Sequence, residues 1–371
     1  MPEKITVPFV DLKHQYLSLK KEINSAVLSV MEDTTFVGGA PVTSFENNFA
    51  ATCGVKYCIG VGNGTDALYI ILKSLGITAG DEVITVANSW ISTSETISQC
   101  GAKPVFVDIE GDYFTIDVNK IEEKITSKTK AIIPVHLYGQ MAEIDKIAAL
   151  CKKHNLFLIE DCAQSHLAEY KAIKAGTTGI ASAFSFYPGK NLGAYGDAGA
   201  ITTNDDLLAT RMRMFANHGA LIKHQHQIEG INSRLDTIQA AILNLKLPHL
   251  QKWNKQRLKN ALLYNQLLAD VSEITTPKIN PASKHIFHLY VIRAEKRNEL
   301  MDYLTKKGIQ TQIHYHIILP LLPAYNYLNH KAEEFSVAAS YQDSILSLPM
   351  FPELTEEQIQ LVVETIKAFY K

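Results

Sequence analysis

Residues 184–193 read Phe-Ser-Phe-Tyr-Pro-Gly-Lys-Asn-Leu-Gly, and a small-residue turn, Gly-Asp-Ala-Gly, follows at residues 196–199. An aromatic, apolar run that stops at Pro188-Gly189 is typical of a buried strand ending in a turn, and it presents a single lysine, Lys190. Apolar surroundings disfavour the ammonium form, which is how a lysine becomes a nucleophile near neutral pH. The alternative is a strand that ends in a glycine turn with an ordinary solvated lysine.

Short β-branched runs alternate with helical patterns from residue 56 to about residue 205. The predicted strands are residues 57–60, 82–86, 104–107, 131–135, 157–159, 183–186 and 200–202, and the predicted helices between them are residues 67–75, 92–99, 121–125 and 141–154. This alternation predicts an α/β fold with a mostly parallel central sheet. Ligands of such sheets bind at the carboxyl ends of the strands.

The two ends of the chain have a different pattern. An extended arm over residues 7–16 leads into a predicted helix at residues 17–31. Beyond residue 245 the pattern predicts a strand at 288–293, a helix at 298–307, a second strand at 310–314 and a closing helix at 356–370. We therefore expect a large domain over residues 1–245 and a smaller α+β domain over residues 246–371.

Composition excludes several classes of protein. With 46% hydrophobic and 20% charged residues and a formal net charge of −2, the chain has no overall field that would recruit nucleic acid or a membrane surface. It has neither a signal-peptide core nor a long apolar run. Five scattered cysteines predict reduced thiols in the cytoplasm, and no metal site is expected because His224 and His226 lack acidic or cysteine partners at suitable spacing.

A glycine turn follows the first predicted strand, with the sequence Gly62-Asn63-Gly64-Thr65-Asp66. Free backbone amides at the start of a helix, helped by the helix dipole, bind phosphate groups. We therefore interpret Gly64 and Thr65 as part of a phosphate cradle. An ordinary turn capped by Thr or Asp is the alternative for this stretch taken alone.

Three further strand ends carry residues that suit a planar, phosphorylated cofactor. Trp90 offers a flat face for stacking, although a core tryptophan is the alternative. Asp161 can pair with a protonated pyridine nitrogen and Gln164 can donate to a ring oxygen, as in pyridoxal 5′-phosphate (PLP) enzymes, although Asp161 could instead cap a helix. Ser185 offers a hydroxyl to a phosphate, and Lys190 offers an amine for a Schiff base.

Taken together, these motifs resemble the DegT/DnrJ/StrS family of PLP-dependent sugar-nucleotide aminotransferases, which have the aspartate aminotransferase-like fold (fold type I). The resemblance covers nearly the whole chain, and it rests on Pro8-Phe9-Val10-Asp11-Leu12, Asn63-Gly64-Thr65-Asp66-Ala67-Leu68, Glu160-Asp161-Cys162-Ala163-Gln164-Ser165, the Phe184 to Leu192 stretch, Gly230-Ile231-Asn232-Ser233-Arg234-Leu235-Asp236 and His314-Tyr315. It implies an aspartate aminotransferase-like large domain with a small C-terminal α+β domain.

The resemblance also implies a role for each residue of the cofactor site. Lys190 would form the Schiff base and move the proton, Asp161 would hold the pyridinium, Gln164 would contact the ring hydroxyl and Trp90 would stack on the ring. The phosphate contacts would come from Gly64, Thr65 and Ser185, together with Asn232 of a partner subunit. The implied active unit is a homodimer with shared active sites.

The substrate contacts implied by the resemblance are Tyr187, His314, Tyr315 and, from the partner chain, Lys223. Two departures from the family pattern stand out: the run His314-Tyr315-His316 lacks the usual following proline, and Ala198 replaces a glycine. The first departure leaves the contacts at the nucleotide end open.

The implied reaction is a two-step transamination. L-Glutamate converts PLP to pyridoxamine phosphate, which then aminates a keto-6-deoxyhexose linked to a nucleotide, with a dTDP-3-keto sugar favoured over a 4-keto sugar and uridine left open. The product would serve the synthesis of amino sugars for polysaccharides or glycosides. The alternatives are a PLP-dependent sugar dehydratase, which has histidine in place of the lysine, and a nucleotide-binding module without catalysis.

Overall fold

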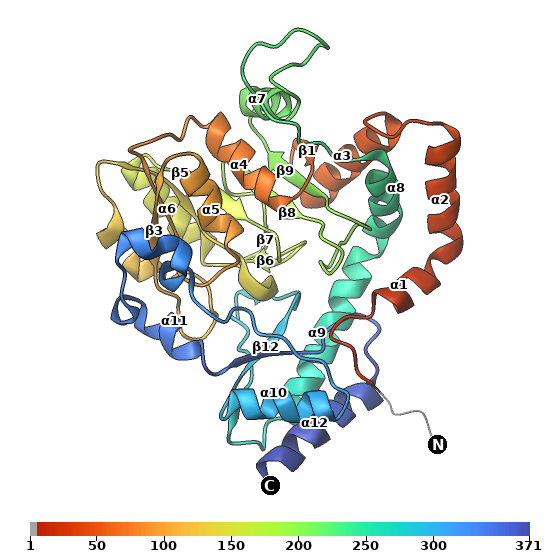
Figure 1. The fold of residues 1–371 in the computed structure, drawn as a ribbon, viewed down its shortest axis with the longest axis vertical. Coiled ribbons are helices and arrows are strands. Elements are labelled where there is room, and N and C mark those ends of the chain that lie inside the picture. The colour runs from red at the N-terminus through yellow and green to blue at the C-terminus, as the bar shows by residue number, and fades with distance from the viewer. Residues whose placement is uncertain (1–5) are drawn as a thin grey trace.

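A seven-stranded sheet forms the centre of the protein in the computed structural model, which describes residues 6–371 (Figure 1). Its strands, in spatial order, are β1 (Tyr57–Val61), β9 (Gly199–Thr203), β8 (Ala181–Ser185), β5 (Phe157–Asp161), β4 (Thr129–Ile133), β2 (Glu82–Val86) and β3 (Lys103–Val107). Strand β9 is antiparallel to both of its neighbours, and the other pairs are parallel. The predicted mostly parallel sheet is confirmed.

Helices cover both faces of this sheet, because its strands are apolar on both sides. In β4, Ala131 and Ile133 belong to one buried cluster and Ile132 belongs to the other, as the two-residue period of a strand requires. One face packs against α4 (Gly64–Ser74), α5 (Ser92–Gln99) and α7 (Asp206–Ala216). The other face packs against α3 (Ala40–Cys53), α6 (Ile144–His154) and α8 (Thr237–Lys246).

The C-terminal part has a smaller antiparallel sheet of β10 (Ile274–Thr275), β12 (Tyr290–Ala294) and β13 (Ile345–Leu348). It is accompanied by α9 (Leu250–Leu267), α10 (Arg297–Lys306), α11 (Ser336–Tyr341) and α12 (Glu356–Tyr370). A third small sheet joins β11 (Ser283–Lys284) to β6 (Glu169–Tyr170) and β7 (Ile173–Lys174). One apolar cluster runs from the large sheet into this part, and the domain boundary near residue 245 stays a prediction.

Short 3₁₀ turns make up the rest of the regular structure. They are η1 (Val118–Lys120), η2 (Glu122–Lys124), η3 (Leu137–Gly139), η4 (Leu247–His249), η5 (Leu319–Leu321), η6 (Pro323–Leu328) and η7 (Ala332–Phe335). No helix among residues 6–371 is long and apolar enough to cross a membrane.

Three predicted elements differ from the structure. The single helix expected at residues 17–31 is two helices, α1 (Leu12–Ser18) and α2 (Lys20–Glu32), because Leu19 leaves the helical conformation. The helix expected at residues 121–125 is replaced by the turns η1 and η2. The strand expected at residues 310–314 makes one backbone bridge, Gln312 to Ser347, and β13 takes the sheet position beside β12.

Candidate active site

Lys190 lies in a tight turn directly after strand β8. The strand is held by Phe184 and Phe186, which are fully buried and pack edge-to-face on Phe49 with ring centroids 5.1 and 5.2 Å apart. The Lys190 backbone N–H donates to the Tyr187 carbonyl at 2.8 Å, which closes the turn. Burial lowers the pKa of Lys190 to about 8, against an opposing effect of the Asp161 charge.

Asp161 lies at the carboxyl end of β5, on the strand next to β8 in the sheet. Its Oδ2 accepts from the Thr93 hydroxyl at 2.8 Å, and its Oδ1 accepts from the Ala163 N–H at 3.1 Å. Burial raises the pKa of Asp161, while these two hydrogen bonds and the charge of Lys190 act in the opposite direction. The carboxylate makes no ion pair within residues 6–371.

Gln164 is held in place by two tyrosines. Its Oε1 accepts from the Tyr138 backbone N–H at 2.7 Å, and its Nε2 donates to the Tyr315 hydroxyl at 3.1 Å. The Tyr138 hydroxyl in turn donates to the carbonyl of His314. The structure therefore brings two predicted substrate residues, His314 and Tyr315, to the predicted cofactor residue.

Two aromatic rings frame the open side of this site. The Trp90 ring is tilted by 46° to the Tyr315 ring at a centroid distance of 5.7 Å, and Trp90 and Tyr187 are each 59% exposed. Trp90 is thus not a core tryptophan. His314 lies deeper: its Nδ1 is 2.8 Å from the Ser347 hydroxyl, and burial together with the charge of Lys190 lowers its pKa to about 4.

The predicted phosphate cradle is the N-terminus of α4. Asn63 caps this helix by accepting from the Asp66 N–H at 2.8 Å, and the Thr65 hydroxyl lies 2.7 Å from the Ser92 hydroxyl. A Cβ on Gly64 would lie 2.8 Å from the Cβ of Ser185, so only glycine allows the helix start to approach that serine. Gly64, Thr65 and Ser185 are therefore neighbours at one helix N-terminus.

Asn232 and Lys223 are both predicted to act from a partner chain. Both are exposed, and neither side chain is hydrogen-bonded to the residues above within the described chain. Lys223 belongs to the loop after α7, which projects from the body of the protein (Figure 1). Asn232 lies beside Ser233, whose hydroxyl donates to Asp66 at 2.6 Å.

Sequence reasoning missed the residues that support Asp161 and Gln164. Thr93 and Ser92 start α5, and Tyr138 follows β4. A signal was present, because β2, β4 and β5 are parallel and the segments after their carboxyl ends meet at one edge of the sheet. The pairing of Thr93 with Asp161, however, joins residues 68 positions apart and cannot be deduced from local pattern.

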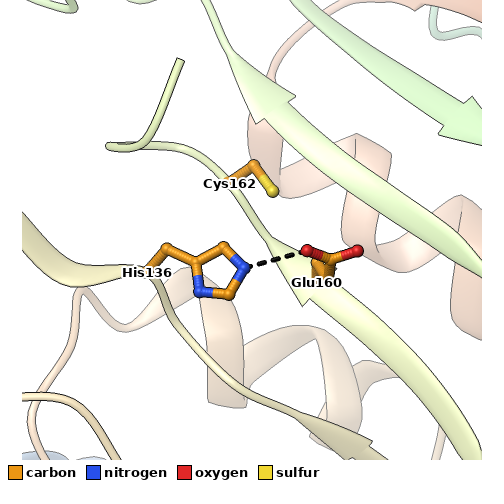
Figure 2. Close-up of side chains that lie close together, drawn as sticks. All are labelled: His136, Glu160 and Cys162. Carbon is orange, nitrogen blue, oxygen red and sulfur yellow. Dashed lines mark hydrogen bonds and ion pairs between the residues drawn. The ribbon is translucent and has the colours of Figure 1, made fainter. Parts of the chain in front are cut away.

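A second missed feature is a buried cluster of His136, Glu160 and Cys162, whose ligand-type atoms lie within 4.8 Å of one another (Figure 2). The His136 Nδ1 accepts from a backbone N–H at 3.2 Å, so Nε2 bears the proton and donates to Glu160 at 2.9 Å. Both nitrogens are thus engaged. Burial alone would raise the pKa of Glu160, but hydrogen bonds from His136 and backbone amides keep it below its usual range.

Glu160 also fixes the segment before β8. Its two oxygens accept from the backbone N–H groups of Gly176, Thr178 and Gly179 at 2.7 to 2.9 Å. Burial raises the pKa of the Cys162 thiol well above its ordinary value, and the charge of Glu160 adds to that effect. The cluster is therefore a hydrogen-bonded support under the active site and leaves no free imidazole nitrogen for a metal ion.

The residues of the site fit PLP. Asp161 is a buried carboxylate without a cation, and Lys190 has an ammonium group without an ion pair or hydrogen bond among the described residues. A protonated ring nitrogen and an aldehyde would satisfy these two groups. The helix N-terminus at Gly64, with two hydroxyls beside it, suits the phosphate. This constellation, on a mostly parallel α/β sheet, defines a PLP-dependent enzyme of the aspartate aminotransferase-like fold.

Comparison with known proteins places the chain in a family. Residues 17–367 match the model of the DegT/DnrJ/EryC1/StrS aminotransferase family. A "pleiotropic regulatory protein" of Geobacillus stearothermophilus is 47% identical over 99% of both chains. The dTDP-3-amino-3,6-dideoxy-alpha-D-galactopyranose transaminase of Aneurinibacillus thermoaerophilus is 43% identical over 98% of this chain and 99% of its own.

The fold of the chain is also similar to that of a solved relative. The crystal structure of DesV from S. venezuelae superimposes with a TM-score of 0.96 at 39% identity, covering 99% of each chain. The chain belongs to the DegT/DnrJ/EryC1/StrS family of PLP-dependent sugar-nucleotide aminotransferases, and it is itself a PLP-dependent aminotransferase. The predicted family, fold and cofactor are confirmed.

Proposed function

We propose that this enzyme transfers the amino group of L-glutamate to a keto-6-deoxyhexose linked to a nucleotide, with a dTDP-3-keto sugar favoured over a 4-keto sugar. One observation carries the proposal: Lys190, whose pKa is lowered to about 8, shares a buried site with Asp161, and neither side chain makes an ion pair within residues 6–371. The 3-position is supported by the Aneurinibacillus relative, whose name specifies a 3-amino-3,6-dideoxy sugar on dTDP.

We assign the proton transfer to the Lys190 Nζ. When bound, PLP withdraws electrons from the carbon that carries the transferred amino group and makes its proton removable. A neutral Nζ accepts that proton, and the resulting ammonium returns it on the other side of the reaction. A pKa near 8 keeps a useful share of both forms near neutral pH.

The other residues of the site bind and orient. Asp161, held by Thr93, keeps the ring nitrogen protonated, since a buried carboxylate strongly favours a cation beside it. Gln164 Nε2 donates to Tyr315 and can donate to the ring oxygen from the same position. Gly64, Thr65 and Ser185 hold the phosphate at the start of α4, and Trp90 stacks on the ring.

Substrate contacts are assigned to the exposed rim of the site. Tyr187 stands beside the turn of Lys190, and His314 and Tyr315 lie against Gln164 and Tyr138. We propose that Tyr187, His314 and Tyr315 approach the sugar. Lys223 of a partner chain would then meet the negatively charged pyrophosphate, which suits an exposed ammonium group.

The active unit in this proposal is a homodimer in which Asn232 of one subunit completes the phosphate site of the other. Four exposed apolar side chains within residues 28–37 support it: Leu28, Met31, Phe36 and Val37 are each about half exposed. Val37 forms a backbone bridge with Asp236, so this segment reaches the loop that carries Asn232.

A subunit-mixing experiment tests the shared sites. Lys190→Ala and Asn232→Asp subunits, each inactive or nearly so alone, are dissociated together and allowed to reassociate. Random pairing makes half of the dimers mixed, and one of the two sites in a mixed dimer is intact, so about a quarter of wild-type activity returns. Sites built within one chain would regain nothing.

The substrate is tested by offering L-glutamate with a panel of 3-keto and 4-keto sugars on dTDP and on UDP, while 2-oxoglutarate is measured. A dTDP-3-keto sugar is expected to have the highest kcat/KM. A preference for a 4-keto sugar, or for UDP, would overturn that part of the proposal and leave the aminotransferase assignment standing. Loss of water from the sugar without uptake of nitrogen would instead identify a dehydratase.

A reducing compartment is part of the proposal. Cys53, Cys58, Cys100, Cys151 and Cys162 are all buried free thiols. Free thiols of this kind are typical of the cytoplasm.

A further inference from the structure

A cavity of about 170 Å³ opens at the surface away from the residues assigned to PLP and the sugar. Its walls come from the end of α3, from the three-stranded sheet of β6, β7 and β11, and from α9. Leu167, Leu258 and Ile286 give it an apolar lining suited to the body of a compact organic molecule.

Two buried polar side chains line this cavity: Asn254 is hydrogen-bonded to Asn191 and His166, whereas His285 has a ring nitrogen without a partner among residues 6–371. His285 is only 5% exposed, and its ring stacks on Phe287 at 3.7 Å with an angle of 5° between the planes. Its Nδ1 accepts from the Phe287 N–H at 2.9 Å, so Nε2 carries the ring proton. Burial lowers the pKa of His285 to about 3, so the ring is neutral. The Nε2–H has no acceptor among residues 6–371 and lacks a partner that a ligand could supply.

Three lysines surround the same cavity. Lys174 donates to the Thr52 carbonyl at 2.9 Å, and Lys284 pairs with Glu169 at 2.8 Å. Lys255 on α9 is exposed, and its ammonium group makes neither an ion pair nor a hydrogen bond in the described part of the chain. The lining therefore has three positive charges against one negative charge, and one of the positive charges is free.

We propose that this cavity binds a small carboxylate with an apolar body, which places its hydrocarbon part against Leu167, Leu258 and Ile286 and its carboxylate between the His285 Nε2–H and Lys255. A carboxylate fits better than a phosphate because Lys174 and Lys284 are already engaged with Thr52 and Glu169, which leaves only the His285 Nε2–H and Lys255 beside a mostly apolar wall. A phosphate dianion would keep several hydrogen-bond acceptors unsatisfied there.

The cavity is connected to the catalytic turn through one wall residue. Asn254 lines the cavity, and its Oδ1 accepts from the Asn191 Nδ2 at 2.8 Å. Asn191 directly follows Lys190 in the chain. None of the residues assigned to PLP or to the sugar lines the cavity, so this inference does not depend on the substrate proposed above.

Benzoate is the probe for this site, because it combines a carboxylate with a compact apolar ring. Calorimetric titration of the PLP-loaded wild type with benzoate is expected to saturate, with benzamide and inorganic phosphate binding more weakly. Lys255→Gln is expected to weaken benzoate binding about two- to fivefold, as for an exposed ion pair. The charge reversal Lys255→Glu is expected to weaken it further, and Leu258→Trp should remove binding by filling the cavity.

Lys252→Gln is the matched control, because Lys252 is another exposed lysine of α9 that does not line the cavity. It is expected to bind benzoate like the wild type. The proposal is overturned if the wild type shows no saturable binding, or if benzamide binds as tightly as benzoate. It is equally overturned if Lys255→Glu and a folded Leu258→Trp variant bind benzoate unchanged, since the ligand would then occupy another site such as the catalytic centre.

Discussion

The reactivity of Lys190 in the cofactor-free protein is a direct consequence of its burial. With a pKa of about 8, its amine is about 9% neutral at pH 7, whereas a lysine with the ordinary value of 10.5 is about 0.03% neutral. The structure thus predicts about a 300-fold larger neutral fraction at Lys190. Because only the neutral amine attacks a carbonyl, its modification rate should rise with pH, reach half of its maximum at about pH 8 and level off at about pH 9.

The measurement is reductive methylation with formaldehyde and cyanoborohydride across pH 6 to 10.5, read for each lysine by peptide mass spectrometry. Formaldehyde is small enough to reach a partly buried amine. Lys252 is exposed and serves as the reference within the same sample. A Lys190 profile that keeps rising to pH 10, like that of an amine in water, would refute the argument from burial.

Replacing Asp161 by Asn tests the sign of the electrostatic effect. The Asp161 charge stabilises the nearby ammonium and so raises the pKa of Lys190 against the effect of burial. Removing this charge should lower the pKa further, and the plateau of the methylation profile should move to lower pH. A shift to higher pH would show that Asp161 does not act on Lys190 in this way.

Three further predictions concern the supports of the site. Gly64→Ala should weaken PLP binding by tenfold or more, because the added Cβ would lie 2.8 Å from the Cβ of Ser185. The control Gly189→Ala should leave PLP titrations nearly unchanged, because its added Cβ would lie 3.9 Å from the nearest neighbouring side-chain atom. Equal effects of the two substitutions on PLP binding would contradict this prediction. Thr93→Val removes a hydrogen bond to the buried Asp161 carboxylate, which costs about 1.5–3 kcal/mol, so the Kd for PLP should rise by tenfold or more. The control Thr85→Val loses a hydrogen bond to a backbone carbonyl on the same sheet and should bind PLP normally. A normal Kd in Thr93→Val would count against the assigned role of Asp161. Glu160→Gln should lower the free energy of unfolding by about 3 kcal/mol in urea titrations, because it disturbs the buried pair with His136 and three hydrogen bonds from backbone N–H groups. A loss of stability below about 1 kcal/mol would show that Glu160 is not a structural support.

The parallel sheet and the chemistry of the lysine turn could be predicted from the sequence. Each strand of the large sheet was found within two residues of its observed ends, because apolar β-branched runs between helical patterns are a local signal. The same holds for α5 and α12, whose bounds match the prediction. Lys190, Asp161, Gln164 and Gly64 stood out because each lies at or just after the end of a strand.

The C-terminal part was harder to predict for a physical reason. Both residues 310–314 and β13 (Ile345–Leu348) are short, and the choice of the sheet partner for β12 depends on long-range pairing. All four residues of β13 are buried, so the segment has no alternating pattern that would identify a strand. The break at Leu19 between α1 and α2 is likewise not marked by glycine or proline.

The sequence alone determined the class of this protein. It places a lysine, a carboxylate, an amide and a glycine turn at strand ends, and the carboxyl ends of parallel strands lie at one edge of the sheet. Only the tertiary structure decided how those groups are supported: Thr93 bonds to Asp161, Tyr138 bonds to Gln164, and Glu160 bonds to the segment before β8. It also revealed the cavity at His285. Periodicity and turn chemistry are properties of neighbouring residues, whereas hydrogen bonds and cavities join segments whose contact depends on the packing of the whole chain.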